Sequence, residues 1–107
     1  MHTELRSLLM DLECQLRMLG CWDDEPPAVE ALASEQPFAI DTLEFYQWLQ
    51  WIFLPRMHQL LDQQLPLPGR CQITVIAEEW VKLRTQDASD LLACLHAIDQ
   101  LLEGAAT

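Results

Sequence analysis

Long apolar runs are missing from this chain of 107 residues. No segment approaches the ~18 consecutive apolar residues that a membrane-spanning helix needs. The first residues also lack the basic and then apolar layout of a secretory signal. We therefore expect a cytoplasmic protein that has no segment within a membrane.

Basic residues are also scarce. Six Lys and Arg residues stand against 17 Asp and Glu residues, which gives a formal net charge of -11. Nucleic acids and anionic membranes attract basic surfaces and repel acidic ones, so this balance argues against direct binding to either. Acidity favours solubility, and it also permits a basic protein as a partner.

The sequence patterns of catalysis and of metal binding are absent as well. The three glycines lie far apart and form no phosphate-binding loop, and no GxSxG, HExxH or DxDxDG motif occurs. The four cysteines include no CxxC pair, and the three histidines are scattered. We expect free thiols, no metal, no cofactor and no enzymatic activity. A carboxylate pair assembled by the fold is the alternative that the sequence leaves open.

Helical periodicity runs through most of what is present. Apolar residues at helical spacing predict helices over residues 3–19, 28–32, 43–64 and 73–83, and from residue 87 to residue 104. Residues 73–76 could also form a strand, but no partner strand exists elsewhere, so a helix is favoured. The sequence therefore predicts one all-α domain over residues 1–107, a compact bundle of four main helices plus one short helix.

The first predicted helix has two apolar faces. Its core-facing stripe consists of Leu5, Leu8, Leu9, Leu12, Leu16 and Leu19. Gly20 follows, where a left-handed residue can end the helix. On the opposite side, Met10, Cys14 and Met18 form a narrower stripe. That stripe either contacts another part of the fold or binds a partner.

The predicted central helix is apolar almost all round. Nine of the twelve residues over 43–54 are apolar, which is typical of a buried helix. Asp41 and Thr42 precede this helix and can cap its first amides. Pro55 lacks the amide that would bond to the Trp51 carbonyl, so we predict that the central helix is kinked near Pro55.

Candidate binding residues gather in the same segment. In a straight helix Arg56 projects toward the core, where an unpaired guanidinium is costly to bury. Either the kink turns Arg56 out to solvent, or Arg56 caps a loop carbonyl, or Arg56 and His58 point into a cleft walled by Trp48 and Trp51. Arg and Trp are enriched in recognition hot spots. The full candidate set for binding a ligand or partner is Phe38, Asp41, Trp48, Trp51, Arg56 and His58.

Several short motifs match a known family. They are Trp22-Asp23-Asp24-Glu25, Gln36-Pro37-Phe38, Asp41-Thr42, Trp48-Leu49-Gln50-Trp51, Pro55-Arg56-Met57-His58 and Leu65-Pro66-Leu67-Pro68-Gly69. With them the chain resembles the YqcC-like family of small bacterial proteins, a domain of unknown function. The resemblance implies a compact helical bundle, and it supplies no activity, cofactor or catalytic residue. Members of that family are often associated with a tRNA pseudouridine synthase through gene neighbourhood.

The residues and the resemblance together support two functional hypotheses. The leading one is a protein-interaction or accessory module, linked to a tRNA pseudouridine synthase by the family resemblance alone. The alternative is a small-molecule-binding bundle whose pocket is lined by Phe38, Trp48, Trp51, Arg56 and His58. In that pocket Arg56 would bind a carboxylate or a phosphate. The oligomeric state does not follow from the sequence.

Overall fold

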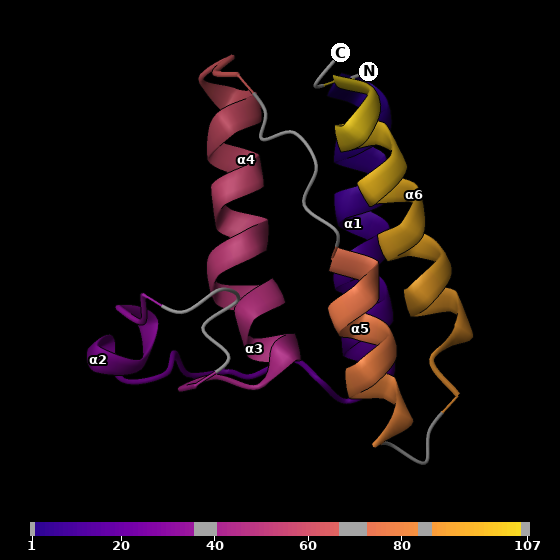
Figure 1. Cartoon of the computed structure of the whole chain (residues 1–107). Helices are drawn as coiled ribbons and strands as arrows, with labels where there is room; N and C mark the ends of the chain where they lie inside the picture. The colour runs from indigo at the N-terminus through magenta and orange to yellow at the C-terminus, as the bar shows by residue number, and fades with distance from the viewer. Residues whose placement is uncertain (1, 36–40, 67–72, 84–86, 106–107) are drawn as a thin grey trace.

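The computed structural model describes residues 2–35, 41–66, 73–83 and 87–105. Its elements in chain order are α1 (His2–Met18), α2 (Val29–Leu32), α3 (Phe45–Trp48), the π-helical segment η2 (Leu49–Phe53), α4 (Leu54–Asp62), α5 (Ile73–Lys82) and α6 (Ser89–Ala105). Because α3, η2 and α4 follow one another without a break, they form one long central helix. The described part of the chain is therefore all-α, with four main helices and one short helix as predicted (Figure 1). None of these described helices is both long enough and apolar enough to cross a membrane.

Helices α1 and α6 form the centre of the bundle. They lie side by side and run antiparallel, and α5 packs against α6 (Figure 1). The fully buried residues of this pair are Leu5, Leu9, Leu12 and Leu16 from α1 and Leu91, Leu95, Ile98 and Leu102 from α6. The α1 residues belong to the stripe that the helical spacing predicted, and both sets form one apolar core with the central helix.

Helix α1 ends in the motif that its sequence predicts. Gly20 adopts a φ of 74°, in the left-handed region that favours glycine. Its amide donates to the carbonyl of Arg17 at 3.1 Å, and the amide of Cys21 donates to the carbonyl of Leu16 at 2.8 Å. These two bonds form a Schellman motif, which satisfies carbonyls of the last turn and reverses the chain direction.

Two carboxylates fix where the last two helices begin. Asp99 of α6 accepts hydrogen bonds from the amides of Ile73 (3.0 Å) and Thr74 (2.7 Å) and from the Thr74 hydroxyl. The first amides of a helix have no partner within it, so this carboxylate anchors the start of α5 on α6. Asp87 likewise accepts from the amide of Ser89 at 3.0 Å, at the start of α6.

The core-facing residues of the central helix recur every four positions. They are Phe45, Leu49, Phe53, Met57 and Leu61, and all are buried. In a regular α-helix such a stripe drifts by ~40° per step, because four residues exceed one turn. Over Leu49–Phe53 the helix is π-helical, and the Leu54 amide donates to the Leu49 carbonyl. A π turn contains one residue more than an α turn, so each residue rotates the chain by a smaller angle and the stripe drifts less. The kink predicted near Pro55 is this π turn, and α3 enters α4 at an angle there (Figure 1).

The cap of the central helix differs from the prediction. Glu44 is the N-cap residue, and its amide donates to Oε1 of Gln47 at 2.9 Å in a reciprocal capping box. Asp41 and Thr42 were predicted to cap this helix, and that prediction is wrong. The physical reason is that the helix begins at Phe45, too far along the chain for their side chains to reach its first amides.

Asp41 and Thr42 hold the short helix α2 instead. The Ser34 hydroxyl donates to Oδ1 of Asp41, and the Thr42 hydroxyl donates to the carbonyl of Ala31 at 2.7 Å. Helix α2 itself buries no residue and lies at the edge of the bundle (Figure 1). These two bonds therefore tie α2 to the segment that leads into the central helix.

Candidate functional site

Trp48 lies in a cluster of aromatic rings. Its ring stacks on Phe53 with centroids 5.4 Å apart and on Phe45 with centroids 6.3 Å apart. Phe45 in turn contacts Trp80 of α5 at 5.8 Å. Trp48 is half-buried and packs against the core. These contacts make Trp48 a packing residue within the central helix, while Phe45 and Tyr46 join that helix to Trp80 of α5.

The other predicted site residues of the central helix line neither of the two pockets described below. Arg56 is exposed, whereas Trp51 and His58 are half-buried. The prediction that the kink turns Arg56 out to solvent is confirmed. The extra residue in the π turn rotates everything that follows, and Arg56 faces solvent. Neither of the two pockets described below is lined by these residues or by Trp48.

The predicted site residues Phe38 and Asp41 precede the central helix, and Trp51 lies within it. Asp41 is exposed and bound to Ser34, and Phe38 lies outside the described residues. The indole Nε1 of Trp51 is buried and has no hydrogen-bond partner within the described part of the chain. A buried donor without a partner costs about 1–3 kcal/mol, so the structure carries an unfavourable group there.

Three polar side chains of the central helix, those of Tyr46, Gln47 and Gln50, bind the loop after α1. The Gln50 side chain accepts from the Asp23 amide at 2.8 Å and donates to the Asp23 carbonyl at 2.7 Å. Tyr46 and Gln47 each donate to the Asp23 carboxylate at 3.2 Å. Burial, and then the charge of Asp23, raises the pKa of Tyr46 above its usual value. Sequence reasoning missed this network, although Glu44, Gln47 and Gln50 are the three polar residues of the apolar stretch 43–54 and were the available signal.

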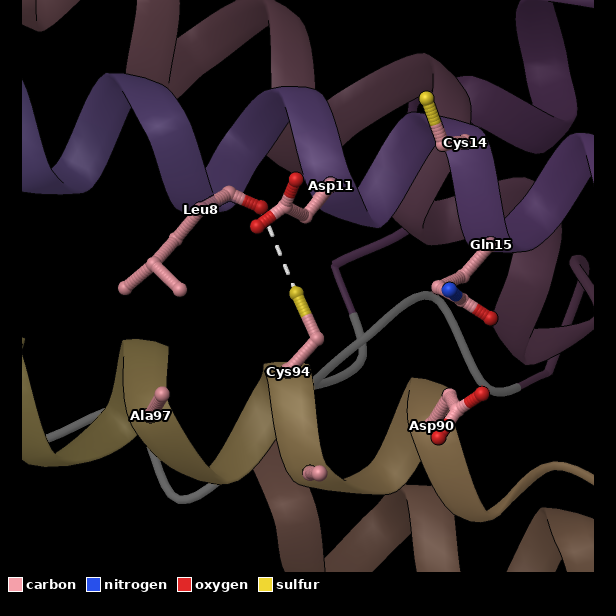
Figure 2. Close-up of a pocket in the computed structure, with 8 residues that line it drawn as sticks. Leu8, Asp11, Cys14, Gln15, Asp90, Cys94 and Ala97 are labelled. Carbon is pink, nitrogen blue, oxygen red and sulfur yellow. Dashed lines mark hydrogen bonds between the residues drawn. The ribbon is translucent and has the colours of Figure 1, made fainter.

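A pocket of about 320 Å³ lies between α1 and α6 (Figure 2). Asp11, Cys14 and Gln15 line it from α1, and Asp90 and Cys94 line it from α6. Asp11 and Gln15 point toward α6, and Asp90 approaches from the other side (Figure 2). Among the residues that the structure describes, no three His, Cys, Asp or Glu side chains could hold a metal ion together.

The thiol of Cys94 is the buried group of this pocket. It donates to the carbonyl of Leu8 at 3.3 Å, across the contact between the two helices (Figure 2). Burial, and then the charge of Asp11, raises the pKa of Cys94 to about 11. Cys94 is therefore a neutral thiol at pH 7 and a poor nucleophile. Cys14, Cys21 and Cys94 are all free thiols, as predicted for them.

A larger and more apolar groove of about 520 Å³ lies between the start of the central helix and the end of α5. Leu43, Phe45, Trp80 and Leu83 supply its apolar lining, and Lys82 lies beside it. Leu83 follows the last residue of α5 and is 87% exposed. At the other end of α5, Ile73 is fully buried in the core.

The whole chain is similar to known bacterial proteins. A family model described as "tRNA pseudouridine synthase C" (DUF446) matches residues 4–101. The chain belongs to this family. It is 38% identical over 101 residues to an uncharacterised protein of Haemophilus influenzae, and the match covers 94% of each chain. It is also 37% identical over 100 residues to the uncharacterised protein YqcC of Escherichia coli, which covers 94% of this chain and 92% of YqcC.

The fold of this DUF446 chain matches a solved structure. The solution NMR structure of Escherichia coli YqcC has a TM-score of 0.83, with 37% sequence identity over 99% of this chain and 91% of that one. A third relative differs in length. The tRNA pseudouridine synthase C of Pectobacterium carotovorum is 49% identical over 67 residues, which span 63% of this chain but 18% of that protein.

Proposed function

We propose that this chain is an accessory, protein-binding module that acts with a tRNA pseudouridine synthase in the cytoplasm. The supporting observation is the stretch of 67 residues, 49% identical to this chain, within a polypeptide named tRNA pseudouridine synthase C. Two units joined in one polypeptide are held close together. Where they are separate chains, a non-covalent contact has to replace that covalent link.

Charge favours the enzyme over the tRNA as the direct partner. The chain has a net charge of -11, and phosphate backbones repel such a surface. An enzyme that holds RNA presents a basic surface, to which an acidic module is complementary. The chain therefore binds the synthase and leaves the tRNA to the enzyme.

The test is direct binding between the purified chain and the tRNA pseudouridine synthase C of the same organism. We expect a complex in size-exclusion chromatography and a dissociation constant that rises with NaCl, because the contact is partly electrostatic. An unrelated acidic helical protein of similar net charge is the control for unspecific attraction. If the chain and the control elute alike with the synthase, the proposal is wrong.

Arg56 connects this proposal to the predicted site residues. Its side chain is exposed, so Arg56→Ala should leave the fold intact. Weaker binding of the synthase by this variant, at unchanged thermal stability, would assign Arg56 to the interface. Unchanged binding would remove it from the candidate set.

The apolar groove at Trp80 favours a second candidate function, binding of a small apolar molecule. Its volume of about 520 Å³ is within the range of ligand pockets. The probe is the dye 1-anilinonaphthalene-8-sulfonate, whose fluorescence rises on apolar surfaces. Leu83→Asp should reduce this signal, whereas Val29→Asp, which alters an apolar residue that is 78% exposed on α2, should not. Equal signals from both variants contradict this function.

A further inference from the structure

The outer face of α1 presents methionines to solvent. Met10 is 66% exposed and Met18 is 78% exposed, with Cys14 exposed between them. A helix advances ~100° per residue, so these three side chains follow one another at ~40° steps. Of the two predictions for this stripe, contact with another part of the fold is wrong, because the side chains are exposed. The stripe is an unpartnered helix face.

The methionine stripe continues directly into the pocket between α1 and α6. Around the axis of α1, Asp11 lies ~100° from Met10, and Met18 lies ~80° from Met10. Asp11 is therefore next to Met18 at the edge of the stripe, and it also lines the pocket. Cys14 belongs to both. We call Met10, Cys14 and Met18 together with Asp11 and Asp90 the α1–α6 surface. It combines an apolar ridge with an adjacent polar depression of about 320 Å³.

The available charges of this surface are negative. Asp11 and Asp90 are exposed and take part in no ion pair among the described residues. The neighbouring cations of α1 are already paired, since Arg6 binds Asp62 at 2.9 Å and Arg17 binds Glu13 at 3.0 Å. A complementary ligand therefore carries positive charge next to apolar side chains.

We propose that the α1–α6 surface binds an amphipathic, basic segment of a partner protein, with a Lys or Arg side chain inserted between Asp11 and Asp90 and apolar side chains on Met10 and Met18. Amphipathic helices dock on apolar grooves in this manner, and methionine adapts to irregular surfaces. This inference rests on the proposed function, and it names the surface and the chemistry of its partner.

A second copy of the chain is excluded as the occupant by charge. In a twofold-symmetric dimer the same surface of both copies meets itself. Such a dimer would bring Asp11 and Asp90 of both copies into one interface, and each copy carries a net charge of -11. Like charges brought together at an interface are unfavourable. A basic partner removes this repulsion.

NMR of the full chain labelled at its methionine methyl groups tests where such a segment binds. The probe is a short amphipathic peptide of leucine and lysine, compared with the same peptide in which glutamate replaces lysine. The Met10 and Met18 signals should shift with the lysine peptide. Met57, which is 1% exposed in the core, is the internal control and should not shift. No shift at Met10 and Met18, or equal shifts with both peptides, overturns the inference.

Charge variants test the insertion between the two carboxylates. Asp11→Asn with Asp90→Asn should weaken binding of the lysine peptide about tenfold, whereas Glu78→Gln with Glu103→Gln should change it less than about twofold. All four residues are exposed, and neither Glu78 nor Glu103 lines the pocket. Met10→Ala with Met18→Ala should also weaken binding. Equal affinities for the Asp and Glu variants overturn the inference.

The same variants separate this inference from the proposed function. If the synthase binds the wild-type chain and the Asp11→Asn, Asp90→Asn variant equally, the α1–α6 surface is wrong and the proposed function stands. If the lysine peptide binds this surface but the synthase binds nowhere, the proposed partner is wrong and the surface stands.

Discussion

Gln50 is a buried polar residue, 5% exposed within a largely apolar helix. Both ends of its amide bind the backbone of Asp23, whose carboxylate accepts from Tyr46 and Gln47 of the same helix. The Gln50 side chain supplies the pairing that a loop backbone needs where water is partly excluded. It therefore connects α1 to the central helix across 27 residues of chain.

Replacing Gln50 tests the energetic weight of that connection. Gln50→Ala removes two hydrogen bonds and leaves the Asp23 amide and carbonyl unpaired, so we expect a loss of about 2 kcal/mol in the free energy of unfolding. Urea denaturation followed by circular dichroism measures it. Gln59→Ala, an exposed position in α4, should change stability by less than about 0.5 kcal/mol. Similar losses at both positions would contradict the role assigned to Gln50.

The Cys94 thiol should make the free energy of unfolding decrease at alkaline pH. The pKa of its thiol is about 11 in the folded chain and ~8.5 in an unfolded one. Between these values the folded state keeps a proton that the unfolded state has lost, so stability falls as pH rises from ~8.5 toward 11. In Cys94→Ala this part of the decline should disappear, while the part due to Tyr46, whose pKa is also raised, should remain. Parallel pH profiles of the urea midpoint for both chains would contradict the assignment.

At the scale of single elements, helix α4 ends with backbone strain that a substitution can relieve. Gln64 has a φ of 54°, and the bonds from the Leu65 amide to the Leu60 carbonyl and from the Gln64 amide to the Leu61 carbonyl repeat the Schellman motif that Gly20 closes in α1. Only glycine adopts this conformation without steric cost.

Gln64→Gly should therefore raise the free energy of unfolding by about 0.5–1 kcal/mol, despite the greater freedom of glycine in the unfolded chain. Gln63 is the matched control, because its φ of -93° suits any residue. Gln63→Gly should lower stability by a similar amount. Thermal melts of the two variants decide the matter, and the prediction is wrong if both glycines destabilise.

Elements were predictable from sequence to the extent that regular spacing determines them. The stripes of α1 and α6 and the end of α1 at Gly20 follow from a period of 3.6 residues and local backbone chemistry. The π turn was not predicted beyond a kink, because the spacing was interpreted with that same period. Five core residues at strict intervals of four, from Phe45 to Leu61, were the available signal.

The candidate site was less predictable because it depends on how distant segments meet. The direction of Arg56 changed with one extra residue in the turn before it. The bonds of Gln50 to Asp23 and the pocket between Asp11 and Asp90 join residues far apart in the chain. Periodicity says which side of a helix is apolar, but it does not say which loop or helix covers the polar side.

At the scale of the whole molecule, unbalanced charge is the dominant electrostatic feature. Seventeen acidic residues face six basic ones, and the three ion pairs seen among the described residues are exposed and contribute little. Folding brings like charges closer together, so their repulsion weakens the compact state. The same negative charge attracts a basic partner. The charge that lowers the stability of the free chain is therefore also the charge that supports the proposed function.

Salt should consequently stabilise this protein. Raising NaCl from ~0.05 to ~0.5 M shortens the Debye length to a few ångströms and screens the repulsion, so the free energy of unfolding should rise by ~1 kcal/mol. Asp24→Asn with Glu25→Gln removes two exposed negative charges from the loop after α1, and this variant should start more stable and gain less from salt. Urea titrations at both salt concentrations measure how much the free energy of unfolding rises with NaCl in the wild-type chain and in the variant. A chain that loses stability with NaCl would show that its ion pairs outweigh its repulsion, and the electrostatic argument for a basic partner would lose its basis.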